Sequence, residues 1–103
     1  MDFTFQTETA LIYDAVHVFA EALSSYDSVQ EITTQPLHCD SDNTWEHGSS
    51  LINYMKLVEM TGLTGQIRFD QYGIRNDFTL DIVELQRPGL VKVGEWHDSH
   101  GIR

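Results

Sequence analysis

Potential metal ligands gather in one short stretch of the chain. Imidazole, thiol and carboxylate groups occur there at His38, Cys39, Asp40, Asp42 and His47. Zinc sites in proteins commonly use paired ligands in patterns such as C-x-x-C or H-x-x-x-H, and this stretch contains neither pattern. The side chains of neighbours such as His38 and Cys39 usually point apart. We therefore expect a polar surface loop here and no bound metal.

Other residues that could do chemistry give weaker signals. His97, Asp98 and His100 lie in a polar C-terminal segment that we expect to be loose, and such a segment rarely holds ligands in place. Covalent catalysis needs an activated Ser or Cys, and the chain contains no G-x-S-x-G elbow. The Gly62-Leu63-Thr64-Gly65 segment lacks the lysine of a phosphate-binding loop. The sequence thus predicts neither an enzyme nor a cofactor.

Length and charge limit the classes of function. A chain of 103 residues forms one domain or less. Sixteen acidic residues against six basic ones give a formal charge of −10, which argues against binding to nucleic acid or to an anionic membrane surface. No segment approaches the roughly 20 apolar residues that a membrane-spanning helix needs.

The N-terminus and the cysteine content bear on the cellular compartment. Residues 1–5 lack the basic start and apolar centre of a signal peptide, so either the protein is cytosolic or its true beginning is absent. Cys39 is the sole cysteine and cannot form an internal disulfide, which by itself favours a reducing compartment. If the chain is a piece of a longer protein, Cys39 could instead be half of a bridge.

The hydrophobic pattern predicts two helices followed by three strands. A helix over 8–24 would place one apolar face toward a core, made of Leu11, Ala15, Val18, Phe19, Ala22 and Leu23. A long polar loop follows over 25–49, and a second helix would then run from about 51 to a stop at Gly62. The period changes from helical to two after Gly62, which predicts strands at 65–70, 78–85 and 90–96. Self-contained α/β domains normally alternate helices and strands, so this order indicates an α/β piece of something larger.

Several segments, taken in this order and spacing, resemble one receptor family. They are 10–18, 37–39, Trp45, 62–70, 73–82 and 89–96. Together they are similar to the final third of the amino-terminal domain of kainate-type ionotropic glutamate receptors. The resemblance implies a partial type I periplasmic-binding-protein-like clamshell, with two helices and about three strands of a bilobed fold. Residues 1–72 would belong to the first lobe, and residues 73–103 would cross into the second.

The resemblance also implies a function and a location. The chain would be part of the extracellular domain of a glutamate-gated cation channel subunit at the postsynaptic plasma membrane. It would contribute to subunit dimerisation and receptor assembly, whereas agonist glutamate would bind elsewhere in the parent protein. Cys39 would pair with a cysteine outside this chain, which reverses the inference of a reducing compartment. Candidates for the dimer interface are Val18, Phe19, Leu37 and Trp45.

The same resemblance points to a cleft between the lobes. Cleft candidates are Tyr13, Asp14 and Ser50, although we expect the ring of Tyr13 to pack with its hydroxyl at the rim. Related metabotropic receptors hold the ligand's carboxylate with a lysine at the position of Ser50, and Lys56 lies almost two turns further on. The absence of that cation argues against strong capture of an acidic amino acid.

Two other interpretations stay open. One is a clamshell domain of a metabotropic or soluble binding protein that closes on an amino acid. The other takes the chain at face value as a small cytosolic α+β protein with a free thiol.

Overall fold

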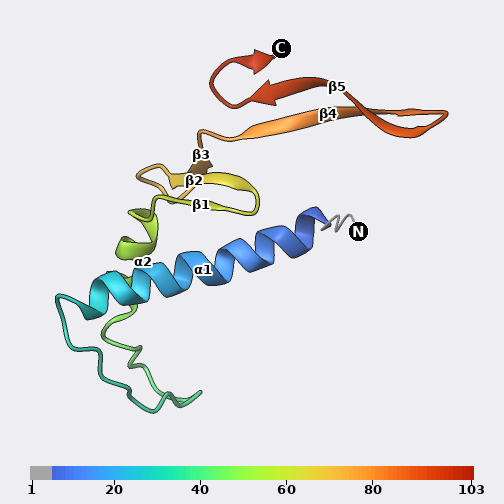
Figure 1. The fold of residues 1–103 in the computed structure, drawn as a ribbon. Coiled ribbons are helices and arrows are strands. Elements are labelled where there is room, and N and C mark those ends of the chain that lie inside the picture. Colours follow the sequence, from blue (N-terminus) through green and yellow to red (C-terminus); the bar gives the residue numbers. More distant parts are fainter. Residues whose placement is uncertain (1–5) are drawn as a thin grey trace.

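A computed structural model of the protein describes residues 6–103 and shows two helices and two small antiparallel sheets (Figure 1). The elements are α1 (Thr7–Asp27), α2 (Gly48–Lys56), β1 (Met60–Gly62), β2 (Gly65–Phe69), β3 (Arg75–Asn76), β4 (Thr79–Gln86), β5 (Gly89–His97) and β6 (Gly101–Ile102). The strand orders are β1-β2-β3 and β4-β5-β6. The predicted α/β class is confirmed, and the arrangement is that of a partial clamshell domain.

The first helix forms where the sequence predicts it and continues to Asp27. Its buried residues lie four apart along the helix and include two polar ones, namely Ala10, Asp14, Val18, Ala22 and Tyr26. Leu11 and Phe19 of the predicted core face are each 44% exposed, so that face was placed partly wrong. The difference arises because Asp14 and Tyr26 are hydrogen-bonded, and a hydrogen-bonded polar group can be buried at little cost.

The second helix is shorter than predicted, and Gly62 is not its stop. The helix ends at Lys56, and the segment Met60–Gly62 is strand β1. Strands β1 and β2 form a hairpin in which Gly62 pairs with Gly65 across the two-residue turn Leu63-Thr64. The apolar spacing around Met60 suits either a helix or a strand, and pairing with β2 decides for the strand.

The second sheet is a long hairpin with a short third strand. Strands β4 and β5 pair from Thr79↔His97 to Gln86↔Gly89, with a bulge at Ile82/Val83. The C-terminal segment is not loose as predicted, because β6 turns back at a positive φ at Gly101 and pairs with β5. The pairing spans only the short turn 98–100, and the two residues of β6 are too few to show an alternating pattern in the sequence.

The hydrophobic core lies between the helices and the first sheet. It consists of Val18, Ala22, Leu51, Val58 and Ile67. The β4–β5 hairpin projects away from this core, and the radius of gyration is 18.5 Å. A compact chain of this length would have a radius of gyration of about 13 Å. Much of the apolar surface of the hairpin is therefore exposed. Separately, no helix in residues 6–103 is long and apolar enough to cross a membrane.

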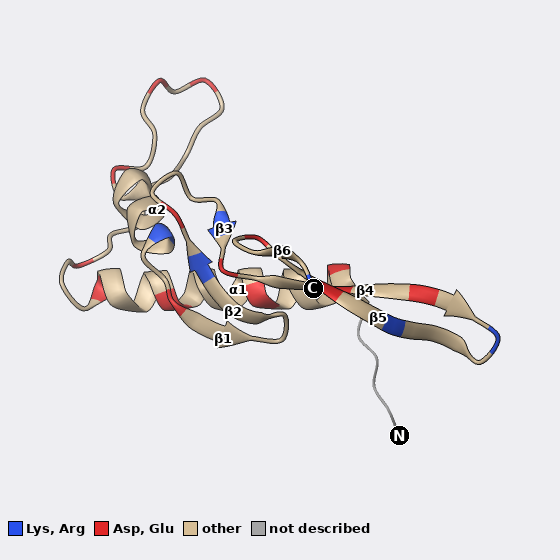
Figure 2. Ribbon diagram, turned by 90° about the horizontal axis from the view of Figure 1, so that it is seen from above, with Lys and Arg blue, Asp and Glu red and all other residues tan. Residues whose placement is uncertain are grey.

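Acidic residues are spread along the molecule and form no single patch. Figure 2 shows them on α1, on the loop between the helices and on the hairpin. This distribution agrees with a solvated acidic surface.

Candidate functional site

The most closely defined polar site in the described chain surrounds the carboxylate of Asp14. Asp14 lies on α1 and is 3% exposed. Its Oδ1 accepts the backbone N–H of Leu63 at 2.8 Å, and its Oδ2 accepts the backbone N–H of Thr64 at 2.9 Å and the Thr64 hydroxyl at 2.5 Å. A Cβ at Gly62 would lie 2.4 Å from Oδ1. The carboxylate thus fastens α1 to the β1–β2 turn and requires a glycine beside it.

The electrostatics of this site favour the ionised carboxylate. Burial raises the pKa of Asp14, but the hydrogen bonds from Thr64 and Leu63 and the positive charge of Arg75 outweigh it and hold the pKa below its ordinary value. Arg75 also donates to the backbone oxygens of Thr64 and Gln66, at 3.3 and 3.0 Å. The hydrogen bonds from Leu63 and Thr64 engage both carboxylate oxygens of Asp14, so its role in this structure is to hold α1 against the β1–β2 turn.

The three cleft candidates of the sequence analysis have different surroundings. Tyr13 is half-exposed and stacks against His17, with ring centroids 4.2 Å apart. Asp14 faces the β1–β2 turn, and Ser50 lies half-buried in the first turn of α2. No hydrogen bond among the described residues connects the three. Their assignment to a ligand cleft therefore stays a prediction.

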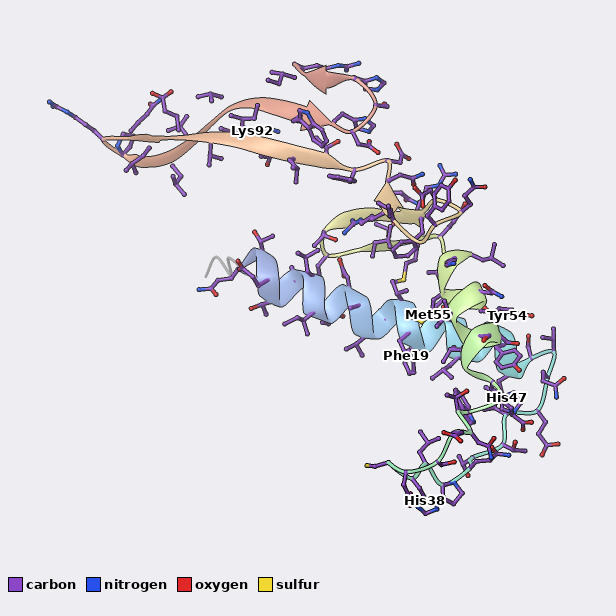
Figure 3. All side chains as sticks on the ribbon, turned by 180° about the vertical axis from the view of Figure 1, so that it is seen from behind. Phe19, His38, His47, Tyr54, Met55 and Lys92 are labelled. Atoms are coloured by element: carbon purple, nitrogen blue, oxygen red, sulfur yellow. The ribbon has the colours of Figure 1, made fainter. Side chains whose placement is uncertain are left out.

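Two apolar hollows flank the contact between the helices and β2. One has a volume of about 270 Å³, and its lining includes Met55, Lys56, Phe69 and Tyr72. The other, of about 250 Å³, shares Met55 and Phe69 and reaches Asp14. Met55 lies between α1 and α2 (Figure 3). Lys56 places one cation at the edge of an otherwise apolar hollow.

The loop between the helices is fastened at its base and exposed at its far end. The hydroxyl of Tyr26 lies 2.6 Å from Nδ1 of His47, and Thr33 contacts Nε2 of the same ring at 3.2 Å. His47 is buried, and both of its nitrogens have protein partners, so it has no free lone pair for a metal. The sequence predicts a polar surface loop that includes His47, and for His47 this prediction is wrong because its side chain is buried. The sequence gives no local signal for the His47 contacts, because Tyr26 lies 21 residues away.

The remaining candidate ligands of the loop are exposed. Cys39 is a free, exposed thiol. It follows His38, which Figure 3 shows at the far end of the loop between the helices. Over residues 6–103, no group of three or more His, Cys, Asp or Glu side chains has the arrangement of a metal site.

The four candidates for a subunit interface divide into two pairs. Val18 is buried in the core, and the indole of Trp45 packs against the core and donates to the backbone oxygen of Thr33 at 3.0 Å. Phe19 projects outward from α1 (Figure 3), and Leu37 is 68% exposed. Only the second pair offers substantial surface to a partner in this structure.

Comparison with known proteins matches residues 2–87 to the family described as "Receptor family ligand binding region". The chain is 40% identical over 94 residues to "Glutamate receptor ionotropic, kainate 4" of Mus musculus, which covers 91% of this chain and 10% of that protein. It is 44% identical over 90 residues to "Glutamate receptor ionotropic, kainate 5" of Homo sapiens, which covers 87% of this chain and 9% of that protein.

The chain thus spans about a tenth of the length of these curated relatives. The relatives are named as receptors and not as enzymes, which agrees with the predicted absence of catalysis. The family match, the identity over nearly the whole chain and the α/β fold lead to one assignment. The chain belongs to the receptor family ligand binding region, as a segment similar to kainate-type ionotropic glutamate receptor subunits.

Proposed function

We propose that the chain is a segment of the extracellular amino-terminal domain of a glutamate-gated cation channel subunit, where it contributes to subunit dimerisation and assembly. The observation that carries the proposal is the outward face of α1. Ile12, Val16 and Phe19 follow steps of four and three residues and are all exposed. This spacing forms an apolar seam along one side of a helix, which is suited to contact with another apolar surface.

A charge placed in this seam tests the proposal. Phe19→Asp in the complete amino-terminal domain should weaken self-association at least about tenfold, because a central aromatic residue often dominates an interface. Sedimentation across a concentration series measures the dissociation constant, with Tyr72→Asp as an exposed control on another element. Two results would overturn the proposal: unchanged association, or loss of folding, which would assign the seam to the domain's own core.

The extracellular location and a disulfide of Cys39 belong to the same proposal. The thiol is exposed on a long loop, which supports this part of the proposal. Such a bridge would restrict the loop and the unfolded chain. Peptide mapping of the full-length receptor without reduction should find Cys39 linked to another cysteine peptide. A Cys39 peptide recovered entirely as free thiol from surface receptors would contradict this part.

We place the division between the lobes where the family resemblance puts it, with residues 1–72 in the first lobe and residues 73–103 in the second. The presence of two separate sheets supports a division of the chain, but β3 (Arg75–Asn76) pairs with β2, so the sheets themselves separate between Asn76 and Thr79.

An amino-acid-sensing clamshell remains the alternative function, favoured by one observation. Lys56 stands at the edge of the hollow beside Tyr72 and could hold a carboxylate. Titration of glutamate into the complete domain decides between the two functions. Tight binding that is lost in Lys56→Met would favour the sensor, and the absence of binding would favour assembly.

A further inference from the structure

The two apolar hollows beside β2 form one groove, because they border the same three side chains. Val18 of α1, Met55 of α2 and Phe69 of β2 line both hollows. The second hollow extends along α1 from Val18 to Leu11, which is about 10 Å at a rise of about 1.5 Å per residue. Volumes of about 270 and about 250 Å³ bring the joined groove into the range of about 300–1,000 Å³ that small-molecule sites occupy.

Lys56 is the one charged residue in the lining of the first hollow. The ion pairs of lysine and arginine in the described chain belong to Arg68 and Lys92, and Lys56 takes part in none of them. Its side chain is half-buried and passes over Gly73, where an added Cβ would lie 3.3 Å from Cε of Lys56. A half-buried ammonium group beside an apolar surface is stabilised by a counter-ion. The charge of Lys56 therefore favours an anionic group from outside the described chain.

The turn that carries Gly73 is held in place by Asp70. Oδ1 of Asp70 accepts the backbone N–H groups of Tyr72 and Ile74, each at 2.9 Å. The N–H of Gly73 donates to the backbone oxygen of Asp70 at 3.0 Å, and the N–H of Asp70 donates to that of Ile74 at 2.8 Å. The wall against which Lys56 lies is thus formed before any ligand binds, which lowers the entropic cost of binding.

The charges along the groove select an apolar carboxylate over an amino acid. The described lining of the first hollow holds one cation and no carboxylate, so the ammonium group of an amino acid would have no partner there. The carboxylate of the second hollow belongs to Asp14, and the β1–β2 turn already engages both of its oxygens. Arg75 of the second hollow lies near this carboxylate and donates to the backbone oxygen of Gln66 at 3.0 Å. Lys56 is therefore the cation that remains for a ligand.

We propose that the groove binds a small apolar carboxylic acid, such as a medium-chain fatty acid. The carboxylate lies on Nζ of Lys56, and the carbon chain runs along Val18, Met55 and Phe69 toward the second hollow. Met55 lies between the two helices (Figure 3), and its unbranched, flexible side chain can adapt to the shape of the chain. The proposal does not rest on subunit assembly, and it differs from amino-acid sensing in the class of ligand.

Titration of decanoate into the complete amino-terminal domain, isotope-labelled at its methionine methyl groups, tests the groove by nuclear magnetic resonance. The Met55 methyl signal, assigned with Met55→Leu, should shift and saturate, whereas the signal of Met60, which lines neither hollow, should not. Decan-1-ol has the chain without the charge, and butyrate has the charge with a short chain. Each should bind at least about tenfold more weakly than decanoate. Glutamate should leave the Met55 signal unchanged.

Two variants sharpen this experiment. Lys56→Met should weaken decanoate binding at least about tenfold, because methionine keeps an apolar stem and loses the charge. Lys92→Met is the matched control and should leave the affinity unchanged, since Lys92 pairs with Asp81 and Glu95 on the hairpin.

Three results would overturn the proposal. One is a Met55 signal that decanoate does not move, as expected if another part of the parent protein covers the groove. The others are equal affinity for decanoate and decan-1-ol, and a Met55 signal that glutamate moves and decanoate does not. All three are measured on the unaltered domain, so the test remains decisive if Lys56→Met fails to fold.

Discussion

The carboxylate of Asp14 occupies the space that a side chain at residue 62 would need. Oδ1 of Asp14 would lie 2.4 Å from a Cβ at Gly62, and the same oxygen accepts the N–H of Leu63. Helix α1 and the β1–β2 turn, which are far apart in sequence, can therefore approach this closely only because residue 62 is a glycine and has no Cβ.

Gly62→Ala should therefore destabilise the fold by about 1–3 kcal/mol, the usual cost of overpacking, because either the turn or the carboxylate must move. Gly48→Ala is the matched control, since a Cβ at Gly48 meets nothing within 4 Å. Urea unfolding followed by circular dichroism measures both variants. Equal stability of the two would mean that the close approach is not tight in solution.

Asp14→Asn should lower the free energy of unfolding by about 2–3 kcal/mol at neutral pH. The amide replaces an acceptor with a donor that faces the N–H and hydroxyl donors of Thr64, and the charge-assisted bonds are lost. Asp40→Asn on the exposed loop is the control and should change stability by less than about 0.5 kcal/mol. Thermal melts of both variants give the comparison.

The pH dependence of stability should carry the signature of Asp14. Because its pKa is lower in the folded chain than in the unfolded one, the folded state binds fewer protons. The contribution is fully present above the unfolded value of about 3.9 and is lost as the pH falls through the lower folded value. Unfolding measured from about pH 7 to about pH 2 should show this acid loss in the unaltered chain and less of it in Asp14→Asn. Parallel curves for the two proteins would contradict the assignment.

Tyr26→Phe should loosen the loop between the helices at a cost of about 1 kcal/mol. The change removes the hydroxyl that contacts Nδ1 of His47 and leaves a buried ring nitrogen without that partner. Hydrogen exchange of the loop amides should rise. Tyr72→Phe, which alters an exposed tyrosine, should leave exchange in the loop unchanged. Equal exchange in the two variants would show that the loop is held by other contacts.

The sequence predicts the elements of this fold better than their contacts. The first helix, β2 and the β4–β5 hairpin follow from apolar period and turn residues, which are local properties. The sequence predicts helix at strand β1 because Val58 and Met60 continue a spacing compatible with both. Strand β6 was missed because only its pairing with β5 makes it a strand.

The polar site lies beyond local patterns for the same reason. Asp14 and Thr64 are 50 positions apart, and a carboxylate on the apolar side of a helix gives no sign of which turn it will meet. The family resemblance, in contrast, was readable from ordered short segments and is confirmed by the family match. The resemblance, and not the apolar period, assigns Val18 and Trp45 to a partner surface, whereas the period already places Val18 on the core face, where the structure has it.

The β4–β5 hairpin projects from the joint at Asp77, where the backbone has a positive φ of 55°. Strand β4 has eight residues, and at roughly 3.3 Å per residue it is about 26 Å long. If the hairpin rotated by about 10° about Asp77, its far turn would move by about 5 Å, given this rise per residue. A small change in backbone angle at the joint is therefore amplified along the hairpin, and Pro88 in the far turn moves furthest.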